Sequence, residues 1–443
     1  MRVSGRALAV VFLMAGCATW GFFAHRDHVF PYRLLRRAYR RLPTRRPPQR
    51  FRPSRSGDTG APEAIEQIAQ LPYLSGYRPA GGSAGVRVYE RGLAEDGLNL
   101  VMDGHASVAV LMDMDGTPVR TWSADAHVLF PGLRLSRAEG ERDRVFLSAC
   151  LTGDGGIVAM FDQIGLVRLD AASRPLWTYR RRVHHALFRE PGGDLWVLSR
   201  EMRPADDLGR DDEIWEDFVE ELTPEGRLLR RVSLIEAFRR SSYAPVLSRL
   251  PSLEDVFHAN SIQVFDGSLA ALSPLFRRGN VLLSLRHLDL LAILDPDGGR
   301  IVWALSGLWR MQHSAWLLPT GRVLLFDNFG APGETSRALE VDPFTQRIAW
   351  TFAGRPGEGL FSETLGAVQR LPGGNTLVVE SNFGRALEVT PGGRIVWEYL
   401  NPNRAGKKNE LVATLYHVER VPRDSPLLGA AGESPARPAS TKP

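Results

Sequence analysis

The chain has 443 residues, of which 44% are hydrophobic and 24% charged, and this composition excludes a wholly disordered or fibrous protein. Residues 1–56 contain thirteen arginines, no lysine and one acidic residue, so they carry a net charge of +12 while residues 57–443 carry −7. The basic pI of about 9.4 therefore belongs to the N-terminal segment. A mildly acidic body argues against nucleic-acid binding, which needs a basic surface.

The N-terminal segment, residues 1–24, contains an uncharged apolar run from residue 7 to residue 24. Eighteen such residues are just long enough to span the hydrocarbon core of a membrane as a helix. We therefore expect a transmembrane anchor. A cleaved signal peptide is an alternative, and so is a lipoprotein, because the sequence LMAGC ends at Cys17.

Residues 25–85 are expected to form an Arg/Pro-rich linker. The eleven arginines of residues 25–55 would remain in the cytoplasm by the positive-inside rule, or they could lie on anionic lipid headgroups. We expect a membrane-anchored protein on the periplasmic face of a bacterial inner membrane, with a cytoplasmic orientation left open. The oligomeric state is not indicated. Residues 423–443 are rich in small residues and proline and are expected to be a disordered tail.

Between residues 86 and 422 the dominant pattern is a repeat of two strands joined by a turn of Asp, Pro or Gly, usually ending in Trp. Alternating apolar and polar residues on both sides of each turn predict a β-hairpin. The six copies lie at residues 108–122, 166–179, 218–232, 291–303, 338–350 and 386–397.

A second repeated unit, x-Leu-Pro-x-Gly-x-x-Leu, precedes most of these hairpins. It is recognised at residues 185–200, 313–328 and 366–381, and residues 416–422 begin a copy that the chain does not complete. The two units together make one blade of four strands, so we predict an all-β, six-bladed β-propeller over residues 86–422. An early strand near residues 86–89 or 98–102 is expected to close the ring. Helical periodicity is confined to the neighbourhood of residues 234–240.

Equivalent positions of successive blades form rings around a propeller axis, and here they carry polar residues. His185, His258 and His313 share one repeat position, with His258 in a looser copy. A second polar set follows the next strand and comprises Gln163, Arg200, Arg286, Asn328 and Ser381. We expect the three histidines and at least one arginine to face a common channel, although Arg200 and Asn328 could equally tie blades together. His184 is expected to point to the opposite face and to be structural, because strand residues alternate; which of His184 and His185 faces the site stays open.

Four stretches carry a resemblance to a known family: FHANSIQVFDG, GNVLLSLRHLDLLAILD, WRMQHSAWLLPTGRVLLFDN and GNTLVVESNFGRALEVTPGGRIVWEY. They resemble the bacterial aryl-sulfate sulfotransferases, over roughly residues 103–422. The resemblance implies a six-bladed propeller that transfers a sulfuryl group from a phenolic sulfate ester to a phenol acceptor without a nucleotide donor (PAPS).

Carried over by position, the resemblance implies that His313 is the nucleophile and forms a transient sulfohistidine. It also implies that His258, Asn260 and Arg286 contact the sulfate, and that His185 is a further substrate-binding histidine of the site. No cofactor and no metal are implied. The extra β-domain of the family's well-known members has no counterpart before residue 86, which leaves dimerisation through it in doubt.

Independently of the family resemblance, these residue types suit the transfer of a sulfuryl group. Charge on a departing sulfuryl group is spread over three oxygens, which fixed donors and a permanent cation stabilise. A neutral imidazole is a competent nucleophile.

Two other classes of protein are alternatives to a sulfotransferase. Histidines around a channel could bind zinc or copper, but no Asp or Glu occupies a ring position and Arg286 would repel a metal. The propeller could also be a non-catalytic, membrane-anchored module that binds a ligand or a protein.

Overall fold

The computed structural model describes residues 79, 81–82, 84–132, 145–333, 335–406 and 409–431. The expected anchor at residues 1–24 lies outside the described residues, as do most of the expected linker and residues 432–443. Within the described ranges, no helix is long and apolar enough to cross a membrane. The chain divides into two units, Met1–Gln70 and Leu71–Pro443, and the description below concerns the second.

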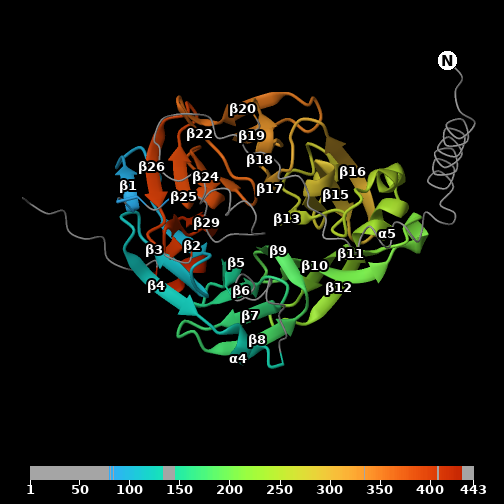
Figure 1. Cartoon of the computed structure of the whole chain (residues 1–443), viewed down its shortest axis with the longest axis horizontal. Coiled ribbons are helices and arrows are strands. Elements are labelled where there is room, and N and C mark those ends of the chain that lie inside the picture. Colours follow the sequence, from blue (N-terminus) through green and yellow to red (C-terminus); the bar gives the residue numbers. More distant parts are fainter. Residues whose placement is uncertain are drawn as a thin grey trace, which may run out of the picture. The chain divides into compact units, whose positions relative to one another are not determined.

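In the described part of this unit, six antiparallel sheets follow one another around a common axis (Figure 1). From the innermost strand outward, blade 1 is β29 (Leu415–Val421), β2 (Leu98–Asp103), β3 (Val108–Met112) and β4 (Pro118–Ser123); blade 2 is β5 (Phe146–Leu151), β6 (Ile157–Phe161), β7 (Gly165–Leu169) and β8 (Pro175–Arg180); and blade 3 is β9 (Val183–Arg189), β10 (Leu195–Pro204), β11 (Glu213–Leu222) and β12 (Leu228–Ser233).

The chain continues around the axis through three more sheets. Blade 4 is β13 (Ala259–Val264), β14 (Val281–Leu285), β15 (Leu290–Asp295) and β16 (Arg300–Ser306); blade 5 is β17 (His313–Leu317), β18 (Val323–Ala331), β19 (Thr335–Val341) and β20 (Ile348–Phe352); and blade 6 is β23 (Ala367–Arg370), β24 (Thr376–Glu380), β25 (Arg385–Val389), β26 (Ile395–Leu400) and β1 (Gly85–Tyr89). The predicted all-β six-bladed propeller is confirmed, and each predicted hairpin supplies strands three and four of one blade.

Two early strands close the ring. β29 forms the innermost strand of blade 1 and pairs with β2, so the last strand of the propeller completes the first blade. β1 adds a fifth strand to blade 6 by pairing with β26. Both early segments that the sequence indicates therefore contribute to closure, each against a different C-terminal strand.

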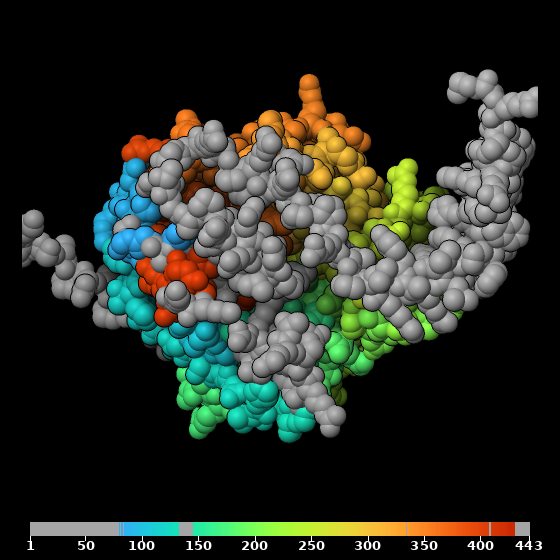
Figure 2. Space-filling view, in the orientation of Figure 1, coloured from blue at the N-terminus to red at the C-terminus, as the bar shows by residue number. Residues whose placement is uncertain are grey.

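The innermost strands β29, β5, β9, β13, β17 and β23 contact one another in that order, and the last contacts the first. The colours of the chain succeed one another around the molecule in the space-filling view (Figure 2). Between neighbouring blades, buried apolar side chains pack in shared clusters. Trp122 and Trp397, from the ends of two hairpin repeats, are 1% and 0% exposed. Burial of a large apolar side chain stabilises a fold by about 1.5–3 kcal/mol, so these two Trp side chains help to hold adjacent blades together.

Short elements connect the blades. The predicted helical stretch forms α5 (Leu234–Arg239), whose N-cap Ser233 accepts a hydrogen bond from the Glu236 amide. The connections between blades also contain α4 (Ala126–Leu129), η2 (Ala244–Arg249), and the hairpins β21 (Gly354–Arg355) with β22 (Glu358–Gly359) and β27 (Arg404–Ala405) with β28 (Leu411–Val412). Strands of one blade are joined through η1 (Asp206–Leu208), η3 (Pro274–Phe276), η4 (Arg286–Leu288) and η5 (Ser381–Phe383), and η6 (Pro426–Ala431) follows the last strand.

Candidate active site

Irregular backbone at the start of three neighbouring inner strands positions the histidines. The pairings of β9, β13 and β17 with the next strand each contain a register shift, which marks a β-bulge. His185, His258 and Ser314 have φ angles of +55°, +52° and +55°. A residue other than glycine in this left-handed region costs on the order of 1–3 kcal/mol, and such strain concentrates at functional sites.

The three predicted histidines come together, with a fourth beside them. The ring centroid of His258 lies 4.5 Å from that of His185, 4.7 Å from that of His287 and 6.4 Å from that of His313. These rings belong to blades 3, 4 and 5. Blade 6 carries Gly366 at the equivalent position, with φ +93° and no room for a side chain, because a Cβ there would lie 2.4 Å from Phe326.

His313 begins β17 and is 4% exposed. Its Nδ1 lies 2.8 Å from Oδ1 of Asn328. The Asn328 amide donates to the carbonyl oxygens of Ser362 and Leu365, at 2.7 and 2.9 Å, and this fixes which of its ends faces the imidazole. Oδ1 can only accept, so Nδ1 of His313 carries the proton. The lone pair of the ring is therefore on Nε2.

The electrostatic surroundings keep His313 neutral. Burial lowers its pKa well below the usual value of 6.5, and the nearby Arg286 guanidinium and His258 lower it further. The hydrogen bond to Asn328 acts in the opposite direction but does not compensate. A neutral imidazole with its lone pair on Nε2 is suited to nucleophilic attack at neutral pH.

Arg286 follows β14 in η4 and is oriented by its neighbours. Nη1 donates to Nε2 of His287 at 3.2 Å, and Nη2 donates to the Glu363 carbonyl at 3.3 Å. His287 can accept because its Nδ1 donates to the backbone carbonyl of Asp255, at 2.7 Å. The guanidinium thus adds a permanent positive charge beside the histidines.

Asn260, in β13, has a partner that the sequence does not predict. Its Nδ2 donates to the carbonyl oxygen of Gln312, at 2.8 Å, so the side chain holds the backbone just before His313. Its Oδ1 is buried and has no hydrogen-bond partner among the described residues. The hydrogen bond from Asn260 to Gln312 is therefore structural. A contact of Asn260 with sulfate remains a prediction.

Asp255 is a site residue that the sequence reasoning missed. Its Oδ2 lies 2.6 Å from Nδ1 of His258, its Oδ1 accepts the His258 amide at 3.0 Å, and Arg200 donates to Oδ2 at 3.3 Å. Although burial raises the pKa of Asp255, His258, Arg200 and His287 lower it below its usual range. The sequence places this carboxylate three residues before His258, which could have indicated a partner for the histidine. Asp255 lies at no repeat position, however, so the repeat did not identify it.

The pKa of His258 is lowered to about 4, because burial and the cationic Arg286 outweigh the attraction of Asp255. His258 is therefore neutral, with Nδ1 donating to the carboxylate. Arg200 also donates from Nε to Gln163 at 2.8 Å. It thereby ties blades 2 and 3 to the loop before blade 4, which is the bridging role that the sequence left open.

The expectation that His184 faces away from His185 is wrong. Nδ1 of His184 lies 3.0 Å from Nδ1 of His185. Alternation of side chains holds only in a regular strand, and β9 has a bulge here: Leu198 pairs with His184, whereas Val197 pairs with Leu187. The two neighbouring histidines therefore contact each other.

Although no carboxylate occupies a ring position, Asp255 stands beside the histidines from a loop. One ligand atom each from Asp255, His258 and His287 lies within 4.8 Å of the others. These groups already have hydrogen-bond partners: the Asp255 carboxylate accepts from Nδ1 of His258, and His287 donates to the backbone carbonyl of Asp255 and accepts from Arg286. A cation here would displace those bonds and meet the Arg286 charge, so the donor set does not favour a metal.

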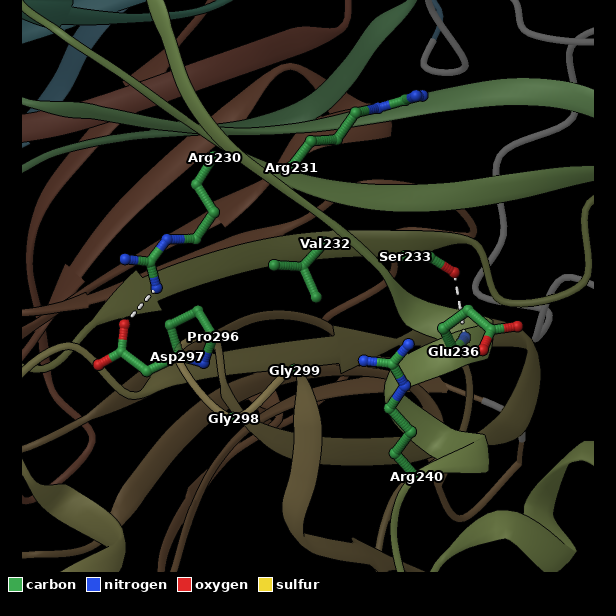
Figure 3. A pocket seen from close by; sticks show the side chains of 10 residues that line it. All are labelled: Arg230, Arg231, Val232, Ser233, Glu236, Arg240, Pro296, Asp297, Gly298 and Gly299. Atoms are coloured by element: carbon green, nitrogen blue, oxygen red, sulfur yellow. Dashed lines mark hydrogen bonds and ion pairs between the residues drawn. The ribbon is translucent and has the colours of Figure 1, made fainter.

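A groove of about 570 Å³ lies elsewhere, between β12 of blade 3 and the β15–β16 turn of blade 4 (Figure 3). None of the clustered histidines lines it. Arg230 pairs there with Asp297 at 2.6 Å, and Arg240 extends toward Gly299. Both elements belong to the outer part of their blades, so the groove is separate from the axial site.

Fold and site together define a six-bladed β-propeller whose axial site combines neutral histidines with one arginine. The family model of the arylsulfotransferases, described as Arylsulfotransferase (ASST), matches residues 154–402, which is more than half of the chain. The chain belongs to this family, and the resemblance found in the sequence is confirmed. The matched segment includes every predicted site residue, from His185 to His313.

Several solved structures are similar to this chain, and no match was found among curated proteins. A protein of unknown function from Bacteroides caccae is 13% identical, with a TM-score of 0.46 over 72% of this chain and 98% of that one. The WD40 propeller domain of Doa1 is 12% identical, with a TM-score of 0.40 over 77% and 96%. Virginiamycin B lyase from Staphylococcus aureus is 11% identical, with a TM-score of 0.36 over 58% and 69%.

Proposed function

We propose that this protein transfers a sulfuryl group from a phenolic sulfate ester to a phenol acceptor, through a sulfohistidine on His313 and without a nucleotide donor. Its membership of the arylsulfotransferase family supports small-molecule aryl substrates. The observation that carries the proposal is the hydrogen bond from Nδ1 of the buried, neutral His313 to Asn328, which places the lone pair on Nε2.

In the first half-reaction, Nε2 of His313 attacks the sulfur and the sulfur–oxygen bond to the phenol breaks, leaving its electron pair on the phenolate. Negative charge on the sulfuryl oxygens is stabilised by the planar guanidinium of Arg286. The imidazole gains positive charge as it is sulfated, and the Asn328 carbonyl still accepts its Nδ1–H. In the second half-reaction the acceptor oxygen attacks the sulfur and restores His313.

Aromatic side chains adjacent to the site support a phenolic substrate. Phe329, Phe361 and Phe383 form a row with ring-centroid separations of 6.1 and 6.2 Å, and all three are half-buried. Phe329 directly follows Asn328, and Phe361 precedes Ser362, whose carbonyl oxygen binds Asn328. An arene can pack against such rings in offset or edge-on geometry.

We further propose that residues 7–24 anchor the protein in a membrane and that the propeller acts on the periplasmic side. The uncharged run of eighteen residues and its short basic start support the anchor. A periplasmic propeller requires the arginines that follow the run to lie on anionic lipid headgroups. The phenolic sulfate ester and the phenol acceptor would then be compounds of that compartment.

The test of the transfer mechanism is to incubate the protein with an aryl sulfate in the absence of acceptor and to map the mass gain. One sulfuryl group is expected on the peptide that contains His313, and none in His313→Asn. His127→Asn, which changes an exposed histidine in α4, is the matched control and should be sulfated like the wild type. An adduct on His258 or His185 would reassign the nucleophile, and the absence of any adduct would refute the covalent mechanism.

A further inference from the structure

The connection between blades 5 and 6 reaches the site in residues 360–365, which have no regular secondary structure. The side-chain amide of Asn328 donates to this segment twice, because the carbonyl oxygens of Ser362 and Leu365 accept from it at 2.7 and 2.9 Å. With its amide engaged, Asn328 presents Oδ1 to the ring of His313. The tautomer of the proposed nucleophile therefore depends on where the 360–365 segment places two carbonyl groups.

The same segment contacts the proposed sulfate-binding group and carries one of the aromatic rings. The carbonyl oxygen of Glu363, between the two carbonyls that hold Asn328, accepts from Nη2 of Arg286 at 3.3 Å. Phe361 is the middle ring of the aromatic row. One short segment therefore supplies a ring for the arene, an acceptor for the guanidinium and both acceptors for the side chain that holds His313.

Asn382, in η5 of blade 6, holds this segment in place. It is 2% exposed. Its Oδ1 accepts the backbone N–H of Thr364 at 2.9 Å, its Nδ2 donates to the Thr364 hydroxyl at 3.1 Å, and its backbone N–H donates to the Ser362 hydroxyl at 3.1 Å. Among the described residues, the side chain of Asn382 has hydrogen bonds with Ser362 and Thr364 alone. Any effect of this side chain on the reaction must therefore pass through the 360–365 segment.

A buried ion pair holds the beginning of the segment. Oε1 of Glu380, the last residue of β24, accepts the backbone N–H of Phe361 at 2.7 Å, and its Oε2 accepts from Nε of Arg385 at 2.6 Å. Glu380 is 0% exposed and Arg385 is 2% exposed. A buried carboxylate is costly unless it is paired and hydrogen-bonded, so this pair resists displacement of the Phe361 backbone.

We propose that Asn382 and Glu380 are positioning residues for sulfuryl transfer, because they hold the 360–365 segment where its carbonyl groups fix Asn328 and orient Arg286. The inference rests on the proposed function. If the segment moved, Asn328 could turn its amide toward Nδ1 of His313. An amide N–H needs an acceptor, so Nδ1 would then hold the lone pair and Nε2 the proton. In that tautomer Nε2 cannot attack sulfur.

The experiment is a double-mutant cycle on the sulfation step. Asn382→Ala removes the side-chain bonds to the segment and leaves no charge unpaired. At saturating 4-nitrophenyl sulfate, the single-turnover rate of sulfation of His313 should fall on the order of 10–10²-fold, as when a group is displaced from its reactive geometry. In the Asn328→Ala background the same substitution should cost less than about threefold, because the residue through which Asn382 acts is already gone. Lower stability alone would not produce this difference.

Asn375→Ala is the matched control. Asn375 is 7% exposed and stands at the opposite end of β24, where its Nδ2 donates to the Leu93 carbonyl and to Glu388, both at 2.8 Å. It loses bonds of the same kind from the same blade, so the melting temperature should fall in both asparagine variants. The sulfation rate of the folded protein should change by less than about twofold in Asn375→Ala, because this site is independent of the segment.

Thr364→Val provides a milder variant if Asn382→Ala does not fold. It removes only the hydroxyl that binds Nδ2 of Asn382 and should slow sulfation several-fold, again with a smaller effect in the Asn328→Ala background. A wild-type rate in the folded variants, equal losses in both backgrounds, or a comparable loss in Asn375→Ala would overturn the inference. Failure of the wild type to form an adduct with any aryl sulfate would instead refute the proposed function itself.

Discussion

Asn328 holds His313 in one tautomer: its Oδ1 accepts from Nδ1 of the imidazole at 2.8 Å, while its amide is fixed by two backbone carbonyls of the following loop. Replacing Asn328 by Ala removes this restraint. We expect the rate of sulfation of His313 to fall on the order of 10²-fold or more, as when the tautomer of a catalytic histidine is no longer fixed. Single-turnover kinetics with an aryl sulfate measure this. A wild-type rate in Asn328→Ala would show that the tautomer is set by other means.

The pH dependence follows from the neutral state of His313. Only the unprotonated ring attacks sulfur, and its pKa is lowered from 6.5 by burial and by Arg286. Activity should therefore persist below pH 6.5 and disappear only as pH falls through the lowered pKa of the folded protein. Because the unfolded chain binds this proton more readily, the contribution of His313 to stability should also decline as pH falls below 6.5. A rate profile of the sulfation step, measured with 4-nitrophenyl sulfate, should place the acidic limb below 6.5; a limb at or above 6.5 would contradict the assignment.

Arg286 is expected to act through its planar fork. Its Nη1 and Nη2 are oriented by His287 and by the Glu363 carbonyl, so a lysine would bring charge without this geometry. Arg286→Lys should lose on the order of 10²–10³ in turnover with little change in thermal stability. Turnover and the melting temperature of the same preparation check this together. Near-full activity in Arg286→Lys would mean that the assigned contact with sulfate is wrong.

The apolar run at residues 7–24 should retain the full-length protein in the membrane fraction until detergent is added. A chain that begins at residue 57 lacks the run and the thirteen arginines of residues 1–56, and it should be released into the soluble fraction. Fractionation followed by immunoblotting tests both. Release of the full-length chain without detergent would contradict an uncleaved anchor.

The fold could be predicted from sequence because the same hairpin pattern recurs in each blade. The hairpin at residues 108–122 is β3–β4 and that at 386–397 is β25–β26, and both place their Trp between blades. Ring closure was harder to assign, because the two candidate early strands pair with different partners, β29 and β26.

The site could be predicted only as far as its residues recur at a repeat position, which identified His185, His258 and His313. Asp255 lies in a loop outside the repeat, so its bond to His258 depends on how that loop folds back. The contact of His184 with His185 arises from a bulge, and a two-residue period cannot indicate one. The bond between Asn260 and the carbonyl of Gln312 joins blades 4 and 5, and only their packing reveals it.

The most direct test of the central claim is a chase of the sulfated protein. The chain is treated with an aryl [³⁵S]sulfate, freed of donor, and then mixed with a phenol acceptor. We predict that the label leaves the peptide containing His313 and appears in a new aryl sulfate at a rate no slower than steady-state turnover, with ping-pong kinetics in both substrates. Label that stays on the protein, or transfer that requires donor and acceptor to be present together, would contradict a sulfohistidine at His313.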